Sequence, residues 1–337
     1  MPIVNPVHSP QESTLRFEPR AISGLRPISE FHLGHYFGAA QQIVDQQNRH
    51  PGETYCLIAD LHATPSWRGR SDMMRTTLET TAALLAVGVN PSKTSLFLQS
   101  SVHGLAEMTW LLACMTPASL LLRNPVLCPQ ISGTLNMGSL LYPILMAADV
   151  LSLKATKILA GRDQAMNVRR VRQIARAANR HMGFQIFPVP EPIQSQTVPG
   201  TDGSKMDHAR NNHIPLFSTF RQLRQRVQQI RTDSRGVSDP KDASACTVFR
   251  LYSMVATSAQ VEELGGRYST GSIGYEEAKR LLAIAIAERF AEATDSFAAW
   301  QKRPADLHDL LRQGGRTASE RAAETIAILR EKFGFGS

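Results

Sequence analysis

Short apolar runs alternate with helix-like segments along the first two-thirds of this 337-residue chain. Residues 55–59 are continuously apolar, which is typical of a strand buried on both faces of a parallel sheet. Residues 20–24, 95–99 and 158–160 are also strand-like, and segments with helical spacing lie between them. This alternation predicts an α/β fold with a doubly wound parallel sheet, in which ligands bind beyond the carboxyl ends of the strands.

Helices are predicted where apolar residues recur every three or four positions. They cover residues 34–47, 73–87 and 140–153, and a further helix opens at residues 161–164. This further helix has four basic residues on one side, opposite an apolar side, at Arg169, Arg172, Arg176 and Arg180. The basic side is either a binding surface or an ordinary solvated helix face.

The rest of the chain has a different pattern. Residues 187–203 are rich in Pro, Gln, Thr and Gly, and this composition indicates a linker. Beyond it, residues 275–300 have a helical stripe of apolar side chains, and residues 317–333 have the pattern of a final helix. The C-terminal region is therefore expected to be an all-helical domain.

Composition excludes several classes of protein. Hydrophobic residues make up 42% of the chain and charged residues 20%, as in ordinary globular proteins. No stretch approaches the ~18 consecutive apolar residues of a membrane span. Residues 1–20 lack the apolar core of a secretory signal. We therefore expect a cytoplasmic protein that has no contact with a membrane and begins with a short N-terminal extension.

The four cysteines do not have the spacing of a zinc site. No pair is spaced C-x-x-C, and Cys56 and Cys114 lie in apolar runs. We expect buried free thiols in a reducing compartment, and no bound metal. The formal charge of +8 comes mostly from arginine, which suits phosphate and RNA backbones but also follows from a composition bias.

The sequence His32-Leu33-Gly34-His35 lies between the first strand and the first helix. A helix N-terminus presents free N–H groups and a partial positive charge, and two imidazoles three residues apart can face one ligand there. Gly34 removes a side chain where a flat base must approach the backbone. The motif, made more specific by residues 23–27 before it, predicts a site for ATP whose phosphates accept from the imidazoles.

A lysine follows a glycine-rich turn later in the chain. Residues 199–203 form the turn, and Lys205, Met206 and His208 lie just beyond it. A lysine on a glycine-flanked loop can clamp a phosphate, although a solvated surface loop has the same composition. Only together with the histidine motif does this loop indicate a phosphate site.

Tyr142, Met146 and Asp149 share one helix face, at spacings of four and three. Two large side chains and one carboxylate can hold an aromatic ring with an N–H donor, such as indole, although a Tyr/Met stripe alone is usually core. Residues 161–164 add a carboxylate and an amide at the end of a strand. These groups suit a ribose and an amino group.

In order and spacing, these segments resemble the tryptophanyl-tRNA synthetases, a family of class I aminoacyl-tRNA synthetases. Residues 22–36 resemble the opening motif of that family, with His32-Leu33-Gly34-His35 as its HIGH element, and residues 199–217 resemble its KMSKS loop region. Further matching segments lie at residues 58–63, 123–125, 142–149, 161–164, 232–233 and 268–282 and in the last helix. Several motifs in the right order are far more specific than any one of them.

The resemblance implies a Rossmann-type catalytic domain at residues 20–203 that binds ATP and tryptophan, after an extension at residues 1–19. A KMSKS-like loop would span residues 204–212. Residues 213–337 would form a helical anticodon-binding region whose last helix packs back on the catalytic domain. The implied protein is a homodimeric, cytoplasmic tryptophan–tRNA ligase that uses ATP and Mg²⁺, charges tRNA(Trp) with L-tryptophan and has no DNA partner.

The resemblance also implies a role for each matching residue. The catalytic residues would be His32, His35, Lys205 and His208. ATP would contact Arg26, His32, Gly34, His35, Gly161, Asp163, Lys205 and Met206. Tryptophan would contact Ser23, Gly24, His62, Tyr142, Met146, Asp149 and Gln164. Asp149 would accept a hydrogen bond from the indole N–H, and no residue is expected to bind a metal.

The loop departs from the family pattern. It reads Lys205-Met206-Asp207-His208-Ala209 where the family has Lys-Met-Ser-Lys-Ser, so that an imidazole replaces the second lysine. A neutral imidazole is a weaker phosphate clamp than an ammonium, and the loss of one such contact typically costs ~2.7–4 kcal/mol. Three alternatives therefore stay open. One is an enzyme that passes an aminoacyl-adenylate to an acceptor other than tRNA, another is a non-catalytic regulator that binds tryptophan or tRNA, and a lesser one is tyrosyl-type specificity.

Overall fold

Within the part of the chain described by the structure, five parallel strands form one sheet at the centre of the protein. The computed structural model describes residues 16–66, 73–122 and 136–335, so the family-like segment at 123–125 and most of the expected extension at 1–19 lie outside the described residues. The strand order is β3–β2–β1–β4–β5. The strands are β1 (Ala21–Leu25), β2 (Thr54–Ile58), β3 (Thr94–Leu98), β4 (Lys157–Gly161) and β5 (Glu191–Ser195).

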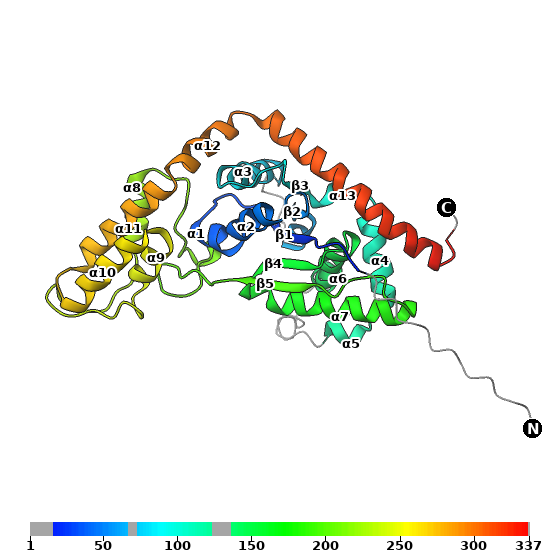
Figure 1. Cartoon of the computed structure of the whole chain (residues 1–337), viewed down its shortest axis with the longest axis horizontal. Helices are drawn as coiled ribbons and strands as arrows, with labels where there is room; N and C mark the ends of the chain where they lie inside the picture. Colours follow the sequence, from blue (N-terminus) through cyan, green and yellow to red (C-terminus); the bar gives the residue numbers. More distant parts are fainter. Residues whose placement is uncertain (1–15, 67–72, 123–135, 336–337) are drawn as a thin grey trace, which may run out of the picture.

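The sheet carries helices on both faces, which confirms the doubly wound fold expected from the sequence (Figure 1). Side chains of β2 alternate between two hydrophobic cores, with Cys56 and Ile58 in the first and Tyr55 and Leu57 in the second. The first core is covered by α1 (Leu33–His35), a π-helical segment (Tyr36–Ala40), α2 (Gln41–Arg49) and α3 (Met73–Ala86). The second is covered by α4 (Leu105–Met115), α5 (Ala118–Leu122), α6 (Met137–Ser152) and α7 (Ala165–Met182).

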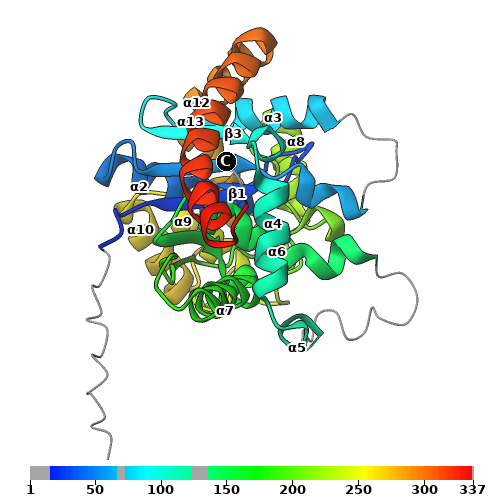
Figure 2. The same ribbon diagram turned by 90° about the vertical axis from the view of Figure 1, so that its right-hand side faces the viewer.

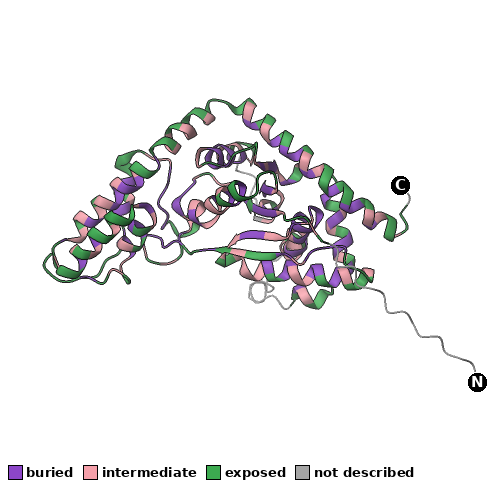
Figure 3. Ribbon diagram, in the orientation of Figure 1, coloured by how far each residue is buried: buried purple, intermediate pink, exposed green. Residues whose placement is uncertain are grey.

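The predicted linker at residues 187–203 is wrong, because this segment contains β5, which pairs in parallel with β4. β5 is an edge strand and is mostly exposed, so it lacks the continuous apolar run of a buried strand (Figure 3). Pro192 is compatible with this position because an edge strand has one side without ladder hydrogen bonds. Ser195, at the end of β5, donates from its hydroxyl to the Gly38 carbonyl at 2.7 Å.

The C-terminal region is all-helical, as the sequence predicted. It contains α8 (Phe220–Gln228), α9 (Thr247–Val255), α10 (Ser258–Thr270), α11 (Tyr275–Arg289) and α12 (Ala291–Gln301). The single helix predicted at residues 275–300 is broken at Phe290, whose φ of −110° and ψ of 17° are not helical. The apolar stripe continues through this break because Phe290 is itself buried against the ring of Tyr36. Periodicity could therefore not reveal the break.

α13 (Pro304–Lys332) begins well before the helix predicted at residues 317–333. It runs along the β3 edge of the sheet (Figures 1 and 2). Leu311 of α13 joins the first core, and Ile326 joins the second. An open sheet edge exposes unpaired backbone groups, and α13 covers this edge.

Gly314 allows α13 to approach β3 closely, since a Cβ at this position would collide with the backbone carbonyl of Leu96. We expect Gly314→Ala to lower the free energy of unfolding by about 3 kcal/mol, because neither backbone can move away without disturbing the core. Gly266→Ala is the control, because Gly266 lies in α10 with open space around it. Alanine there should stabilise the protein by about 0.5–1 kcal/mol. Equal stability of the two variants in denaturant unfolding would contradict the close approach.

Cys56 is buried, but Cys114 is exposed, so the expectation of a buried thiol is wrong for Cys114. Its apolar neighbours in the sequence face the core, whereas Cys114 itself lies on the outer side of α4. Among the helices in the described residues, none has the length and apolar composition needed to cross a membrane.

Candidate active site

A cavity of about 500 Å³ opens at the carboxyl ends of β1 and β4. β1 lies between β2 and β4, so the strand order reverses here, and doubly wound sheets bind ligands at such a point. Every predicted site residue except Gly161 lines the cavity. Gly161 is the last residue of β4 and precedes the short turn that carries Asp163.

His32 and His35 lie at the N-terminus of α1. The Nδ1 of His32 accepts a hydrogen bond from the Gly34 N–H at 3.1 Å, and the Nδ1 of His35 accepts one from the His32 N–H at 3.3 Å. The two rings stack with their centroids 3.6 Å apart. A Cβ at Gly34 would lie 2.8 Å from the His32 ring, so glycine at this position makes room for the capping imidazole as well as for a ligand.

Both imidazoles are neutral at pH 7. The pKa of His32 is lowered to about 2, mainly by burial and to a smaller extent by the nearby His35 and His213. The pKa of His35 is lowered to about 4, mainly by burial and to a smaller extent by His213. Because the Nδ1 of each neutral ring accepts a hydrogen bond, its proton lies on Nε2. Each ring can therefore donate one hydrogen bond to an anionic ligand without carrying a charge itself.

The lowered pKa of His32 makes the stability of the fold depend on pH. In the unfolded chain this imidazole takes up a proton below its ordinary pKa of 6.5, whereas in the fold it stays neutral down to about pH 2. The contribution of His32 to the free energy of unfolding is therefore complete above pH 6.5, and it is lost as the pH falls from there toward 2. When the pH is lowered from about 7 to about 5, we expect the titration of His32 to lower the free energy of unfolding by about 2 kcal/mol.

The variant His32→Asn tests this prediction, because asparagine keeps a side-chain acceptor for the Gly34 N–H and does not titrate. We expect the midpoint of thermal unfolding to fall less for the variant than for the wild type when the pH is lowered from about 7 to 5. Parallel pH dependence of the two proteins would show that His32 is not held neutral by the fold.

Lys205 and Asp163 form an ion pair across the cavity. The Nζ of Lys205 lies 2.8 Å from the Oδ2 of Asp163. Burial acts to raise the pKa of Asp163, but hydrogen bonds from Lys205 and Gln164 outweigh it and hold this pKa below its usual value. Met206 is buried in the first core, and this anchors the loop beside the ion pair.

Asn212 holds the loop in shape and was not predicted as a site residue. Its buried amide donates to Asp202 at 2.8 Å and to the Lys205 carbonyl at 3.0 Å, and its side-chain oxygen accepts from the Asp207 N–H at 2.7 Å. A buried amide with this many partners fixes the backbone around it. The sequence shows two adjacent asparagines here, but no spacing that separates their roles.

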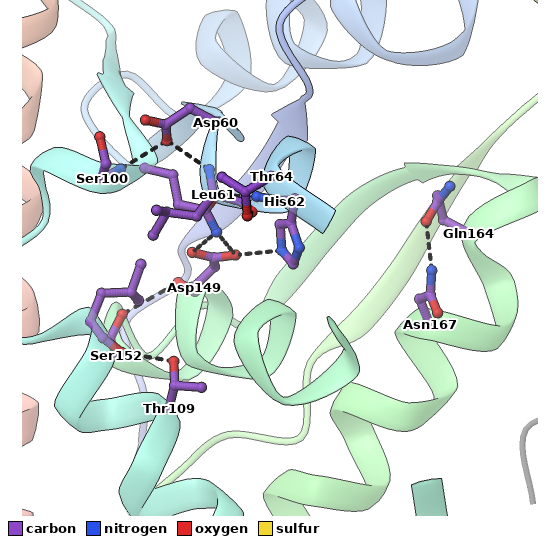
Figure 4. Close-up of polar contacts among 12 residues, drawn as sticks. Asp60, Leu61, His62, Thr64, Ser100, Thr109, Asp149, Ser152, Gln164 and Asn167 are labelled. Atoms are coloured by element: carbon purple, nitrogen blue, oxygen red, sulfur yellow. Dashed lines mark hydrogen bonds and ion pairs between the residues drawn. The ribbon is translucent and has the colours of Figure 1, made fainter. Parts of the chain in front are cut away.

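Asp149 is buried and accepts hydrogen bonds inside the cavity (Figure 4). The Nε2 of Gln99 donates to its two oxygens at 2.9 and 3.0 Å, and the Nε2 of His62 lies 3.2 Å from its Oδ2. Burial raises the pKa of Asp149, while the hydrogen bonds from His62 and Gln99 oppose that shift. Gln99 follows β3 and was not predicted. A carboxylate has about four acceptor sites, so Asp149 can accept from a further donor.

Tyr142 and Met146 give the cavity its large side chains next to Asp149, as the helical spacing predicted. The ring of Tyr142 lies beside that of His62, with the centroids 4.1 Å apart. Gln164 lies away from this group in Figure 4. Its Nε2 donates to Asp163 at 2.9 Å, so in this structure it belongs to the Asp163 side of the cavity.

Ser23, Gly24 and Arg26 line the cavity at and beyond the end of β1. The Ser23 hydroxyl donates to the Leu159 carbonyl of β4 at 3.1 Å. This bond ties together the two strands that flank the cavity.

A pairing between distant segments brings further polar residues to the rim of the cavity. The backbone of residues 31–33 pairs with that of residues 214–216. This pairing places the buried His213 beside Glu30, with 2.7 Å between Nε2 and Oε2. The Nε2 of His208 lies 3.7 Å from the same glutamate oxygen. Neither Glu30 nor His213 was predicted from the sequence, since they lie 183 residues apart.

The chain is similar to known proteins over most of its length. The family described as tRNA synthetases class I (W and Y) matches residues 16–291. The tryptophan–tRNA ligase of Fusobacterium nucleatum is 35% identical over 320 residues, covering 94% of this chain and 98% of that protein. The corresponding ligase of Rhodopirellula baltica is 34% identical, covering 94% and 99%.

A solved structure shows the same similarity in three dimensions. The tryptophanyl-tRNA synthetase of Campylobacter jejuni, complexed with ADP and tryptophan, is 32% identical to this chain with a TM-score of 0.83, covering 94% of this chain and 99% of that one. The chain therefore belongs to the class I tRNA synthetases of the tryptophan and tyrosine family.

Proposed function

We propose that this chain is a tryptophan–tRNA ligase. It activates L-tryptophan with ATP, which gives tryptophanyl-adenylate and pyrophosphate. It then transfers the tryptophan from the adenylate to tRNA(Trp), and AMP leaves. The observation that carries the proposal is one cavity that holds both a neutral imidazole pair at a helix N-terminus and a buried carboxylate beside large side chains. Support also comes from the Campylobacter jejuni relative, which was solved with ADP and tryptophan.

ATP enters as its Mg²⁺ complex, with its phosphates at the N-terminus of α1. His32 and His35 donate their Nε2–H groups to phosphate oxygens, which the hydrogen bonds at their Nδ1 atoms support. Lys205 exchanges its ion pair with Asp163 for the phosphates, and Asp163 then accepts from the ribose hydroxyls. Backbone and side-chain contacts to ATP are assigned to Arg26, Gly34, Gly161 and Met206.

Tryptophan lies between Asp149 and the large side chains of Tyr142 and Met146. Asp149 accepts from the indole N–H, and Ser23, Gly24 and His62 complete the pocket around the ring. We assign Gln164, which lies on the Asp163 side of the cavity, to the amino group of tryptophan. The Nδ1 of His62 is buried and has no partner among the residues that the structure describes, which leaves it available to the bound amino acid. These assignments rest on the resemblance and on the lining of the cavity.

A carboxylate oxygen of tryptophan attacks the α-phosphorus of ATP. The bond between that phosphorus and the oxygen that bridges to the β-phosphate breaks, and its electron pair leaves with pyrophosphate. The attacking carboxylate is already ionised, so no general base is needed. Catalysis then depends on positioning and on stabilising the charge of the phosphates, which His32, His35 and Lys205 provide.

We assign residues 20–203 to catalysis, residues 204–212 to the phosphate loop and residues 213–337 to tRNA recognition. Phe220, Arg221 and Arg224 are exposed around a shallow pocket on α8, which supports an RNA-binding role for that region. Exposed apolar side chains on α4 and α6, including Trp110 and Met137, support a homodimer. We place the protein in the cytoplasm, as its bacterial relatives suggest.

Amino-acid-dependent exchange of pyrophosphate into ATP tests the activation step without tRNA. We expect exchange with L-tryptophan and little with L-tyrosine or the other amino acids. The absence of exchange with tryptophan in folded protein would contradict the proposal. Exchange with L-tyrosine and not with L-tryptophan would show that the protein has tyrosyl-type specificity.

A further inference from the structure

The loop of this chain has an imidazole where the resemblance predicts a second lysine, and that imidazole has neighbours that can share a metal ion. The Nε2 of His208, the Nε2 of His213 and a carboxylate oxygen of Glu30 lie within 4.8 Å of one another. No other group of three or more potential metal ligands occurs among the described residues. Two histidines and one glutamate form a known ligand set for Zn²⁺, with a fourth position open.

The three residues converge from two separate segments. His213 is 2% exposed, and its Nε2 points at Glu30 with 2.7 Å between the two atoms. In the part of the chain that the structure describes, the Nδ1 of His213 has no partner, so Glu30 is the one hydrogen-bond partner of this buried ring. This contact already brings two possible metal ligands together. Binding of an ion between them needs the pair to separate by less than about 1 Å and the third ligand to approach.

His208 is that third ligand. Its side chain is 59% exposed, and its ring already stacks on His213 with the centroids 4.7 Å apart. Two ligands of one tetrahedral Zn²⁺ ion, each at ~2.1 Å, lie about 3.4 Å apart. The 3.7 Å between the Nε2 of His208 and the Oε2 of Glu30 is close to this separation. Rotation of the exposed His208 side chain can bring its Nε2 to a similar distance from that of His213.

We propose that Glu30, His208 and His213 bind a divalent transition-metal ion of the Zn²⁺ class at the rim of the cavity. Glu30 and His208 line the cavity, so an ion held by them lies beside the space assigned to the phosphates of ATP. The ion supplies there the positive charge that the second lysine of the loop supplies in the family. The metal site stands on geometry alone, whereas its role toward phosphate rests on the proposed function. A metal ion at this site would depart from the sequence-based expectation that no residue binds a metal.

Several other charged and titratable groups lie near the proposed metal site. Lys205 lies on the same loop, and its ammonium pairs with Asp163 in this structure. Asp207 accepts from the Ala209 N–H at the start of the short helical turn that carries His208. His32 stacks on His35 and has its centroid 5.6 Å from that of His213. The pair formed by His32 and His35 uses its Nδ1 atoms for capping, so it does not compete for the ion through them.

Binding of Co²⁺ and Zn²⁺ to protein stripped with a chelator tests the site directly. We expect one ion per chain, with the visible absorption of tetrahedral Co²⁺, and binding at least about tenfold weaker in Glu30→Gln and His208→Lys. His308→Ala is the matched control, since it removes an exposed histidine of α13 that does not line the cavity. Both test variants change exposed side chains, and circular dichroism checks their folding. Equal Zn²⁺ binding by the wild type and both variants would overturn the site.

Pyrophosphate exchange at saturating Mg²⁺ separates the binding of the metal ion from its role toward phosphate. We expect Zn²⁺ to raise the rate of tryptophan-dependent exchange in the stripped wild type. The exchange rate of stripped His208→Lys should not respond to Zn²⁺, because the new ammonium supplies the positive charge. Zn²⁺ that binds without raising the exchange of the wild type would overturn the role toward phosphate. A complete lack of exchange in every variant would overturn the proposed function, while the Co²⁺ spectrum would still decide the metal site.

Discussion

Asp149→Asn is expected to lower kcat/KM for tryptophan by about 10²–10³, with a much smaller change in KM for ATP. The carboxylate already accepts from Gln99 and His62, so it serves these donors and the indole N–H together. Asparagine has one acceptor oxygen and turns an N–H₂ group toward one of these donors. A buried donor that is left unpaired costs about 1–3 kcal/mol, and sites built around hydrogen bonds discriminate strongly when one is lost.

The variant Asp295→Asn is the control for this measurement, because it makes the same chemical change on the exposed side of α12. Pyrophosphate exchange at varied tryptophan and saturating ATP gives kcat/KM for tryptophan, and exchange at varied ATP and saturating tryptophan gives KM for ATP. Thermal unfolding shows whether the Asp149 variant is folded. A folded Asp149→Asn protein with an unchanged kcat/KM for tryptophan would mean that the amino acid does not contact this carboxylate.

Lys205→Ala is expected to lower kcat of the exchange reaction by about 10²–10³ and to leave KM for tryptophan unchanged. Lys205 is the lysine that lines the cavity among the described residues, and His208 replaces the second lysine of the family loop. Its ion pair with Asp163 is about half exposed, so its loss should change stability by less than about 1 kcal/mol. The expected defect is therefore in the reaction and not in the fold.

The exposed Lys302, which follows α12, provides the matched control, and Lys302→Ala should behave as wild type. Single-turnover measurement of adenylate formation separates the chemical step from product release. Wild-type rates in Lys205→Ala would show that the loop does not act on the phosphates and would remove Lys205 from the catalytic residues.

Local spacing explains which parts of the site could be predicted from the sequence. Tyr142, Met146 and Asp149 lie on one helix, so their shared face follows from the helical period alone. The pair His32 and His35 lies within one turn at a helix N-terminus. In each case a few neighbouring residues define the geometry, and the structure brings these groups to one cavity.

The remaining site residues come together only through the sheet and the loop pairing. Gln99, just after β3, reaches Asp149 of α6 although 50 residues separate the two in the sequence. Glu30 reaches His213 because residues 31–33 pair with residues 214–216. No periodicity or spacing connects such residues before the fold is known. The edge strand β5 was mistaken for a linker for another reason, since most of its side chains are exposed and it lacks the apolar run of a buried strand.

Charging of purified tRNA with labelled amino acids, at saturating ATP and Mg²⁺, is the decisive test of the proposed ligase activity. We expect the wild-type protein to esterify tRNA(Trp) with L-tryptophan and to leave other tRNAs and other amino acids uncharged. Formation of tryptophanyl-adenylate without charged tRNA would contradict this expectation, and would instead indicate an enzyme that passes the activated amino acid to another acceptor.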